Sequence, residues 1–335
     1  MSGHLTGRRE LITLLGGVAA AWPLAARAQQ QQRMRHIGVL ISLEMNDPES
    51  QGWAKAFEQR LQSRGWTAGR NVQVDYRWAG GVGESTRIAA AELIAMSPDV
   101  IVADGTPTLL AVQRETQSIP IVFVLVPDPV AAGIVPSLAR PGGNITGFTH
   151  YEYPTAGKWL EVLKEIAPAT TRALVLTRDP TAGPGSLTIR AIEAVGRSLG
   201  VQVIPATVAA AADFERAIGS FADRPNAGLV VLPNIVTSVH RELIVALAAR
   251  HRLPAVYPYR HFTAAGGLLS CSIDATEQFR QAATYVDRIL RGEKPADLPV
   301  QAPVKYETAL NMKTAKVLGL EVPTSILLRA DEVIE

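Results

Sequence analysis

The sequence predicts an α/β protein made of two Rossmann-like, doubly wound parallel-sheet domains joined by crossover segments. Short apolar runs alternate with amphipathic helical stretches from residue 35 onward, and the glycine- and proline-rich segment 139–147 interrupts this alternation. The chain has 335 residues, more than one hydrophobic core usually serves. Its composition, 47% hydrophobic and 19% charged, is typical of an ordinary soluble α/β protein.

Residues 1–28 are expected to be a signal peptide that is removed on export. Arg8 and Arg9 precede an apolar stretch that is short for a membrane span, and Ala26 and Ala28 supply the small residues of a cleavage site. The paired arginines favour the twin-arginine route, with the general secretory route as the alternative. Cleavage would take the formal charge from +2 to 0. A neutral chain in the periplasm argues against nucleic acid as a partner, because phosphate binding needs a basic surplus.

The first lobe is expected over 34–148. Its strands are predicted from continuous or alternating apolar runs, and its helices from apolar residues at helical spacing, such as Trp53, Phe57 and Leu61. The expected strands are 36–42, 71–78, 99–105 and 119–126, and the expected helices are 50–65, 85–98 and 106–117.

The second lobe is expected over 149–270, where the same alternation resumes. Strands are predicted at 171–177, 201–207, 227–233 and 253–258, and helices at 156–168, 185–200, 213–221 and 237–251. Residues 271–335 continue neither series: a long helix from residue 276 is followed by an extended segment with prolines. This tail is expected to return to the first lobe as a helix and crossover segments.

In open α/β sheets, ligands bind beyond the carboxyl ends of the strands. Polar or conformationally special residues follow several predicted strands: Ser42, the turn Gly105-Thr106-Pro107-Thr108, the segment Pro127-Asp128-Pro129, Arg178 and Asn234. The first turn of a helix at 105–108 would offer free N–H groups to a carboxylate, although Thr106 could equally serve as a plain helix cap.

Asp128 stands between two prolines, directly after an apolar run. It fits the N-cap of a helix that starts at Pro129, and it also fits a rigid loop that presents a carboxylate or helix N–H groups to a ligand. Tyr257 and Tyr259 alternate at the end of another predicted strand, so each fits either the core or an aromatic ligand contact.

Motifs for catalysis or for nucleotide binding are missing from the sequence. It has neither a G-x-S-x-G nucleophile elbow nor an H-E-x-x-H zinc motif, and the glycine cluster 79–86 lacks the spacing of a nucleotide loop. Cys271 is the single cysteine, which excludes an intramolecular disulfide and a cysteine-rich metal site. We therefore expect neither an enzyme nor a bound cofactor or metal.

The segment "FVLVPDPVAAGIVPSLARPGGNITG" (123–147) resembles the signature of the tryptophan/tyrosine-type family of ABC transporter substrate-binding proteins, and the leader and the ending "NMKTAKVLGLEVPTSILLRADEVIE" resemble it as well. The resemblance implies a type I periplasmic binding protein with three crossover segments and a ligand between the lobes. It places the ligand carboxylate near Thr106 to Thr108 and Asp128, with Arg178, Asn234 and Tyr257 opposite. The full set of expected ligand-binding residues is Ser42, Gly105, Thr106, Thr108, Asp128, Pro129, Arg178, Asn234, Tyr257 and Tyr259.

The resemblance also implies transport without catalysis: the chain would carry a small carboxylate, an amino acid and possibly an aromatic one, to the transmembrane subunits of a permease. The alternatives are a periplasmic sensory module that serves a membrane receptor and, with less support, a Rossmann-like enzyme. One departure from the family concerns Ser270-Cys271-Ser272, where relatives commonly have Ser-Tyr-Gly. If that tyrosine lines the cleft in relatives, the ligand preference here would differ.

Overall fold

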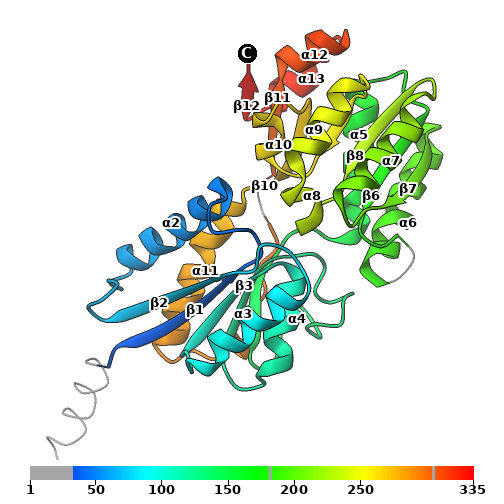
Figure 1. The fold of residues 1–335 in the computed structure, drawn as a ribbon. Helices are drawn as coiled ribbons and strands as arrows, with labels where there is room; N and C mark the ends of the chain where they lie inside the picture. The colour runs from blue at the N-terminus through cyan, green and yellow to red at the C-terminus, as the bar shows by residue number, and fades with distance from the viewer. Residues whose placement is uncertain (1–32, 181–182, 304–305) are drawn as a thin grey trace, which may run out of the picture.

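The computed structural model describes residues 33–180, 183–303 and 306–335, and it shows two α/β lobes joined by crossover segments (Figure 1). The signal peptide expected at 1–28 lies outside the described residues. Within the described residues, each lobe has one sheet of mainly parallel strands, covered by helices. The predicted fold class is therefore confirmed.

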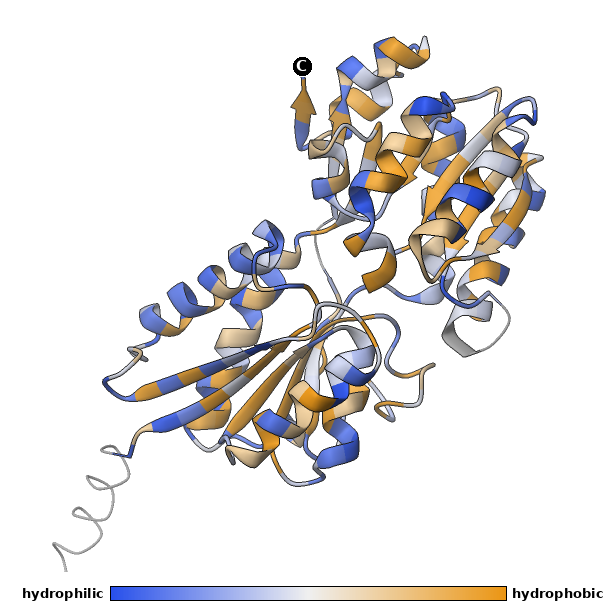
Figure 2. Ribbon diagram, viewed as in Figure 1, coloured by the Kyte–Doolittle hydropathy of each residue, from blue (hydrophilic) through white to orange (hydrophobic). Residues whose placement is uncertain are grey.

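The first lobe contains a five-stranded parallel sheet in the order β2-β1-β3-β4-β5. Its central strands are buried on both faces, which explains why they are continuous apolar runs (Figure 2). The strands are β1 (Arg35–Ile41), β2 (Val72–Trp78), β3 (Val100–Asp104), β4 (Ile121–Val126) and β5 (Ile145–Thr149), and the helices between them are α2 (Pro48–Ser63), α3 (Glu84–Ala95) and α4 (Gly105–Glu115).

Helix α11 (Ala275–Leu290), from the tail, completes the first lobe by packing beside α2. The rings of Trp53 on α2 and Phe279 on α11 stack with centroids 5.2 Å apart. Phe57 and Leu61 extend the same apolar stripe of α2 and are fully or almost fully buried. Asp47 and Asp274 cap the two helices by accepting backbone N–H groups of their first turns.

The second lobe has a seven-stranded sheet in the order β12-β11-β10-β9-β8-β6-β7. Strand β11 runs antiparallel to β10, whereas the other pairs are parallel. The strands are β6 (Arg172–Thr177), β7 (Gln202–Thr207), β8 (Ala227–Val231), β9 (Ala255–Tyr257), β10 (Leu269–Ile273), β11 (Tyr306–Asn311) and β12 (Glu332–Ile334). The helices are α5 (Gly157–Ile166), α6 (Gly183–Leu199), α7 (Ala211–Ala222), α8 (Ile235–Val239), α9 (Arg241–Arg250), α10 (Arg260–Ala264), α12 (Met312–Leu318) and α13 (Thr324–Arg329), with short 3-10 turns at Tyr153–Ala156 and, beside the first lobe, Pro295–Asp297.

The tail differs from the expectation that it returns to the first lobe as a whole. Its helix α11 does lie on the first lobe, but residues 306–334 add β11, α12, α13 and β12 to the second lobe. The chain therefore passes between the lobes after β5, after β10 and before β11 in the described part of the chain. The helix expected at 237–251 is also divided, because α8 ends before His240 and α9 begins after it.

Candidate ligand-binding cleft

A cavity of about 520 Å³ opens between the lobes at the carboxyl ends of the parallel strands. Residues that directly follow β1, β3, β4, β5, β6 and β8 contribute to its wall, and so does Tyr259, two positions after β9. Six of the ten expected ligand-binding residues line it, namely Ser42, Gly105, Thr106, Arg178, Asn234 and Tyr259, whereas Thr108, Asp128, Pro129 and Tyr257 do not.

Ser42 lies on the first-lobe side of the cleft and is bound to a buried carboxylate. Its backbone N–H and its hydroxyl donate to the two oxygens of Asp104, at 2.6 and 2.7 Å. Asp104 is 3% exposed, and burial raises the pKa of its carboxyl group to about 6 although both hydrogen bonds oppose that rise. Because the hydroxyl proton of Ser42 is used in this way, its oxygen is left to accept a hydrogen bond from the cleft.

The first turn of α4 forms the neighbouring part of the wall. Gly105 has a φ of 73°, which lets the chain turn sharply from β3 into the helix. Asp104, not Thr106, occupies the N-cap position, and Thr106 lies inside the first turn, so the helix-cap interpretation of Thr106 is wrong. Thr108 donates its hydroxyl to the backbone carbonyls of Asp104 and Gly105 and is completely buried, because it points into the helix rather than into the cleft.

The segment around Asp128 differs from the expectation of a helix cap. Residues 129–144, all of them described, form turns instead of a helix, and Asp128 itself has a φ of 33°. Its carboxylate accepts the backbone N–H groups of Ala131 and Tyr153, at 3.1 and 3.4 Å, and its own N–H donates to the carbonyl of Tyr151 at 2.9 Å. Asp128 thus joins the loop after β4 to the crossover segment after β5.

Strand β4 contains a bulge next to the cleft, where its register with β5 shifts between Phe123 and Val126. Leu125 has a φ of 57° there, and its side chain lines the cleft. The side-chain amide of Gln278 on α11 accepts the N–H of Leu125 at 3.1 Å and donates to the carbonyl of Thr149. A buried side chain from the tail therefore holds an irregular strand end in place.

Aromatic rings make up the hinge side of the cleft. His150, Tyr151 and Tyr153 follow β5, and Tyr259 follows β9. The rings of His150 and Tyr259 are stacked with centroids 5.4 Å apart, and Tyr151 meets His150 edge to face at 5.2 Å. Burial lowers the pKa of His150 to about 3, so its ring is neutral at physiological pH, and burial raises the pKa of Tyr151 to about 12. Trp53 contributes a fifth ring from α2.

The second lobe supplies the opposite wall. Arg178 is exposed there, next to the cavity. Asn234 caps α8: its carbonyl oxygen accepts the N–H of Thr237 at 2.9 Å, and its amide donates to the carbonyl of Leu232 at 3.2 Å. Tyr257, the last residue of β9, is 1% exposed and stacks on Phe262 in the core, whereas Tyr259 lies beyond the end of the strand and lines the cleft.

Sequence reasoning missed Asp104, Trp53 and the residues His150, Tyr151 and Tyr153. The three aromatic residues stand directly after the predicted lobe boundary at 148, and that position was the signal that could have revealed them. Cys271, where the sequence departs from its relatives, does not line this cleft: it borders a different cavity, of about 710 Å³, beside α5. Its neighbour Ser272 lies behind the cleft wall, with Oγ 3.4 Å from Nε2 of His150.

In the described part of the chain, no three His, Cys, Asp or Glu side chains are grouped so that they could hold a metal ion. The search for membrane spans, limited to the same residues, found no helix with the length and apolar character that a crossing requires.

Two α/β lobes with parallel-strand sheets and an interlobe cleft match the fold of type I periplasmic binding proteins. The chain belongs to the family described as ABC transporter substrate binding protein, whose sequence profile matches residues 37–334. A curated relative, the "Tyrosine-binding protein" of Clostridioides difficile (strain R20291), is 24% identical over 290 residues, which is 87% of this chain and 82% of that protein.

Solved structures share the fold. A conserved domain protein from Vibrio cholerae is 25% identical with a TM-score of 0.82, and the match covers 90% of this chain and all of that one. The "ABC domain in complex with L-Trp" from Streptococcus pneumoniae is 23% identical, also with a TM-score of 0.82 and the same coverage.

Proposed function

We propose that this protein is the extracytoplasmic solute-binding component of an ABC importer and that it binds an aromatic α-amino acid in the cleft between its lobes. The observation that carries the proposal is a pair of complementary groups on the first lobe. An oxygen backed by a buried carboxylate and the N-terminus of a helix lie side by side, next to a wall of aromatic rings.

The polar groups fit the two charges of an amino acid. The Ser42 oxygen can only accept from the cleft, because its proton is donated to Asp104, and it therefore suits an ammonium group. The N–H groups in the first turn of α4, together with the Thr106 hydroxyl, suit a carboxylate. Ser42 follows β1 and Thr106 follows β3, and these strands are neighbours in the sheet.

The apolar part of the cleft fits a ring. Trp53, Tyr151, Tyr153 and Tyr259 present aromatic surface, and neutral His150 adds no charge that would repel or attract the ligand. Ring–ring contacts of this kind contribute about 0.5–1.5 kcal/mol each beyond the area that they bury. Relatives that are named for tyrosine binding or solved with L-Trp support the same ligand class.

The family and the leader expected at 1–28 support delivery to a permease and a location outside the cytoplasm. Ligand contacts from both lobes would stabilise a closed form that the transmembrane subunits recognise. In cells that lack the gene, uptake of the labelled amino acid should fall. Unchanged uptake together with a lost transcriptional response would instead favour the sensory alternative.

The binding experiment is isothermal titration of protein that has been unfolded and refolded to remove any ligand carried through purification. L-Trp, L-Tyr and L-Phe are compared with tryptamine, which lacks the carboxylate, and with indole-3-propionate, which lacks the ammonium. We expect binding of at least one aromatic amino acid and a loss of about tenfold or more with either truncated analogue, because each leaves a polar group in the cleft without its partner. Equal affinity for an amino acid and its truncated analogues would refute the pairing of charges. Binding of none of the three amino acids would refute the ligand class.

A further inference from the structure

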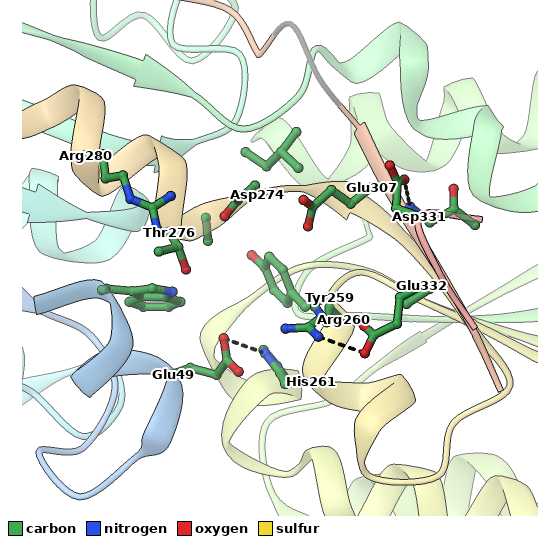
Figure 3. A pocket seen from close by; sticks show the side chains of 15 residues that line it. Glu49, Tyr259, Arg260, His261, Asp274, Thr276, Arg280, Glu307, Asp331 and Glu332 are labelled. Atoms are coloured by element: carbon green, nitrogen blue, oxygen red, sulfur yellow. Dashed lines mark hydrogen bonds and ion pairs between the residues drawn. The ribbon is translucent and has the colours of Figure 1, made fainter. Parts of the chain in front are cut away.

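The lobes touch each other away from the hinge, at the first turn of α2. Asp47, the cap of that helix, forms an ion pair with Arg241 of α9, with Oδ2 and Nη1 2.7 Å apart. Two residues further on, Glu49 faces His261 of α10, with Oε2 and Nδ1 3.6 Å apart (Figure 3). One turn of the first lobe thus meets two helices of the second.

The Asp47–Arg241 pair is largely shielded from water, since 10% of the Asp47 side chain and 18% of the Arg241 side chain are exposed. Its carboxylate divides its oxygens: Oδ1 accepts the N–H of Glu49 within α2, and Oδ2 accepts from the other lobe. The guanidinium also donates to the carbonyl of Ser238, at 3.1 Å, and Ser238 lines the ligand cleft. The pair therefore connects α2 directly with the cleft wall of the second lobe.

Arg241 occupies the first position of α9, where the partial positive charge of the helix disfavours a cation. The stability of α9 by itself therefore does not account for an arginine at this position, whereas a carboxylate on the opposite lobe does. Apolar contacts reinforce the junction: Ile235 of α8 packs against the core of the first lobe, and Val82 packs against the core of the second.

We propose that Asp47 and Arg241 form a closure latch: the pair holds the lobes together across the cleft before ligand arrives, and it slows the reopening through which ligand leaves. Both are positioning residues, since neither lines the cleft. The effect on ligand release rests on the proposed function, whereas the effect on lobe separation does not.

The first test measures the distance between the lobes in ligand-free protein. Nitroxide labels are attached at Ser63→Cys and Ser220→Cys, two exposed positions on α2 and α7, in a Cys271→Ser background. Double electron–electron resonance then gives the distance distribution of protein that has been unfolded and refolded to remove any bound amino acid.

Two single variants break the latch with little local damage. Asp47→Asn keeps the helix cap, because asparagine caps as well as aspartate does, and Arg241→Gln removes the unfavourable cation from the start of α9. The control is Arg35→Gln, which breaks the Arg35–Asp99 pair inside the first lobe at 3.1 Å, with side chains 23% and 16% exposed.

We expect each latch variant to shift the distribution toward longer distances, and the control to leave it unchanged. The double variant should match the single ones, because the second change removes a partner that has nothing left to bind. A distribution equal to that of the wild type in both latch variants, or effects that add in the double variant, would overturn the latch.

The second test is stopped-flow dissociation of L-Trp, the chosen probe, from the same proteins. We expect release to be about tenfold faster in the latch variants, as for the loss of a mostly buried ion pair, and unchanged in the control. Unchanged release despite wider lobes would overturn the role in release. If the wild type binds L-Tyr or L-Phe and not L-Trp, that amino acid replaces the probe. If it binds none of the three, the proposed function fails, and the distance measurement still decides the latch.

Discussion

The buried carboxylate of Asp104 gives the sharpest prediction. Burial raises its pKa from an ordinary value of 3.8 to about 6, so the folded state holds the proton more tightly than the unfolded chain does. At a pH below the pKa that Asp104 has in the unfolded chain, this preference for the proton contributes its full stabilisation to the folded state. As the pH rises through the folded pKa, the contribution is lost. A shift of roughly two pKa units corresponds to about 3 kcal/mol of unfolding free energy.

The perturbation is Asp104→Asn, which keeps the shape of the side chain and cannot ionise. The introduced amide can still accept the N–H of Ser42 through its oxygen, and its NH₂ group can donate to the Ser42 hydroxyl in place of the present bond. We therefore expect the variant to lack this one pH-dependent contribution. As the pH rises from about 4 to about 6.5, the unfolding free energy of the wild type should fall by about 3 kcal/mol relative to that of the variant.

The assay is urea unfolding followed by circular dichroism at several pH values, for the wild type, for Asp104→Asn and for Asp223→Asn. Asp223 is exposed, follows the end of α7 and does not line the cleft, so its variant controls for the removal of a carboxylate as such. Taking the difference in unfolding free energy between proteins at each pH cancels the contributions of the carboxylates that they share. Glu165 and Glu332 are among these shared groups: hydrogen bonds and arginine partners lower their pKa values and outweigh the effect of partial burial. A difference between wild type and Asp104→Asn that does not change with pH would refute the reasoning.

The remaining predictions concern the walls of the cleft and the bulge. Gln278→Leu should lower the free energy of unfolding, measured with urea, by about 2–4 kcal/mol, because it removes the partner of the N–H of Leu125 and of the carbonyl of Thr149. Gly147→Ala should lower the unfolding free energy by at least about 3 kcal/mol or prevent folding, since the new methyl group would lie 2.1 Å from a carbonyl oxygen of β4. The control Gly143→Ala adds its methyl group in open space, at a φ of 60°, and should lower the unfolding free energy by about 1 kcal/mol. Tyr259→Ala should weaken amino-acid binding by about tenfold in titration calorimetry with little loss of stability, and Tyr257→Ala should lower the unfolding free energy by about 3–5 kcal/mol. Equal losses of stability in the two tyrosine variants would contradict the assignment of Tyr257 to the core and of Tyr259 to the cleft wall.

The sequence by itself determined the two βα series and the positions where polar residues follow strands. A strand that is buried on both faces must be apolar throughout, and a helix with one buried face must repeat its apolar residues about every 3.6 positions. Both patterns are local, so they can be recognised directly in the sequence. Ser42, Gly105 and Thr106 were found in this way, because the carboxyl ends of parallel strands lie at one edge of the sheet.

Only the tertiary structure decided which of these residues act together. Asp104 and Ser42 are 62 positions apart and meet because β1 and β3 are neighbours, and Gln278 reaches β4 from a helix 153 positions away. Tyr257 and Tyr259 have the same local signal, but β9 ends at Tyr257, which lies in the core, and the chain has left the strand at Tyr259, which lines the cleft. Local patterns record how deeply a residue is buried, whereas the identity of its neighbours depends on how distant segments pack, and that information is not contained in any one stretch of the chain.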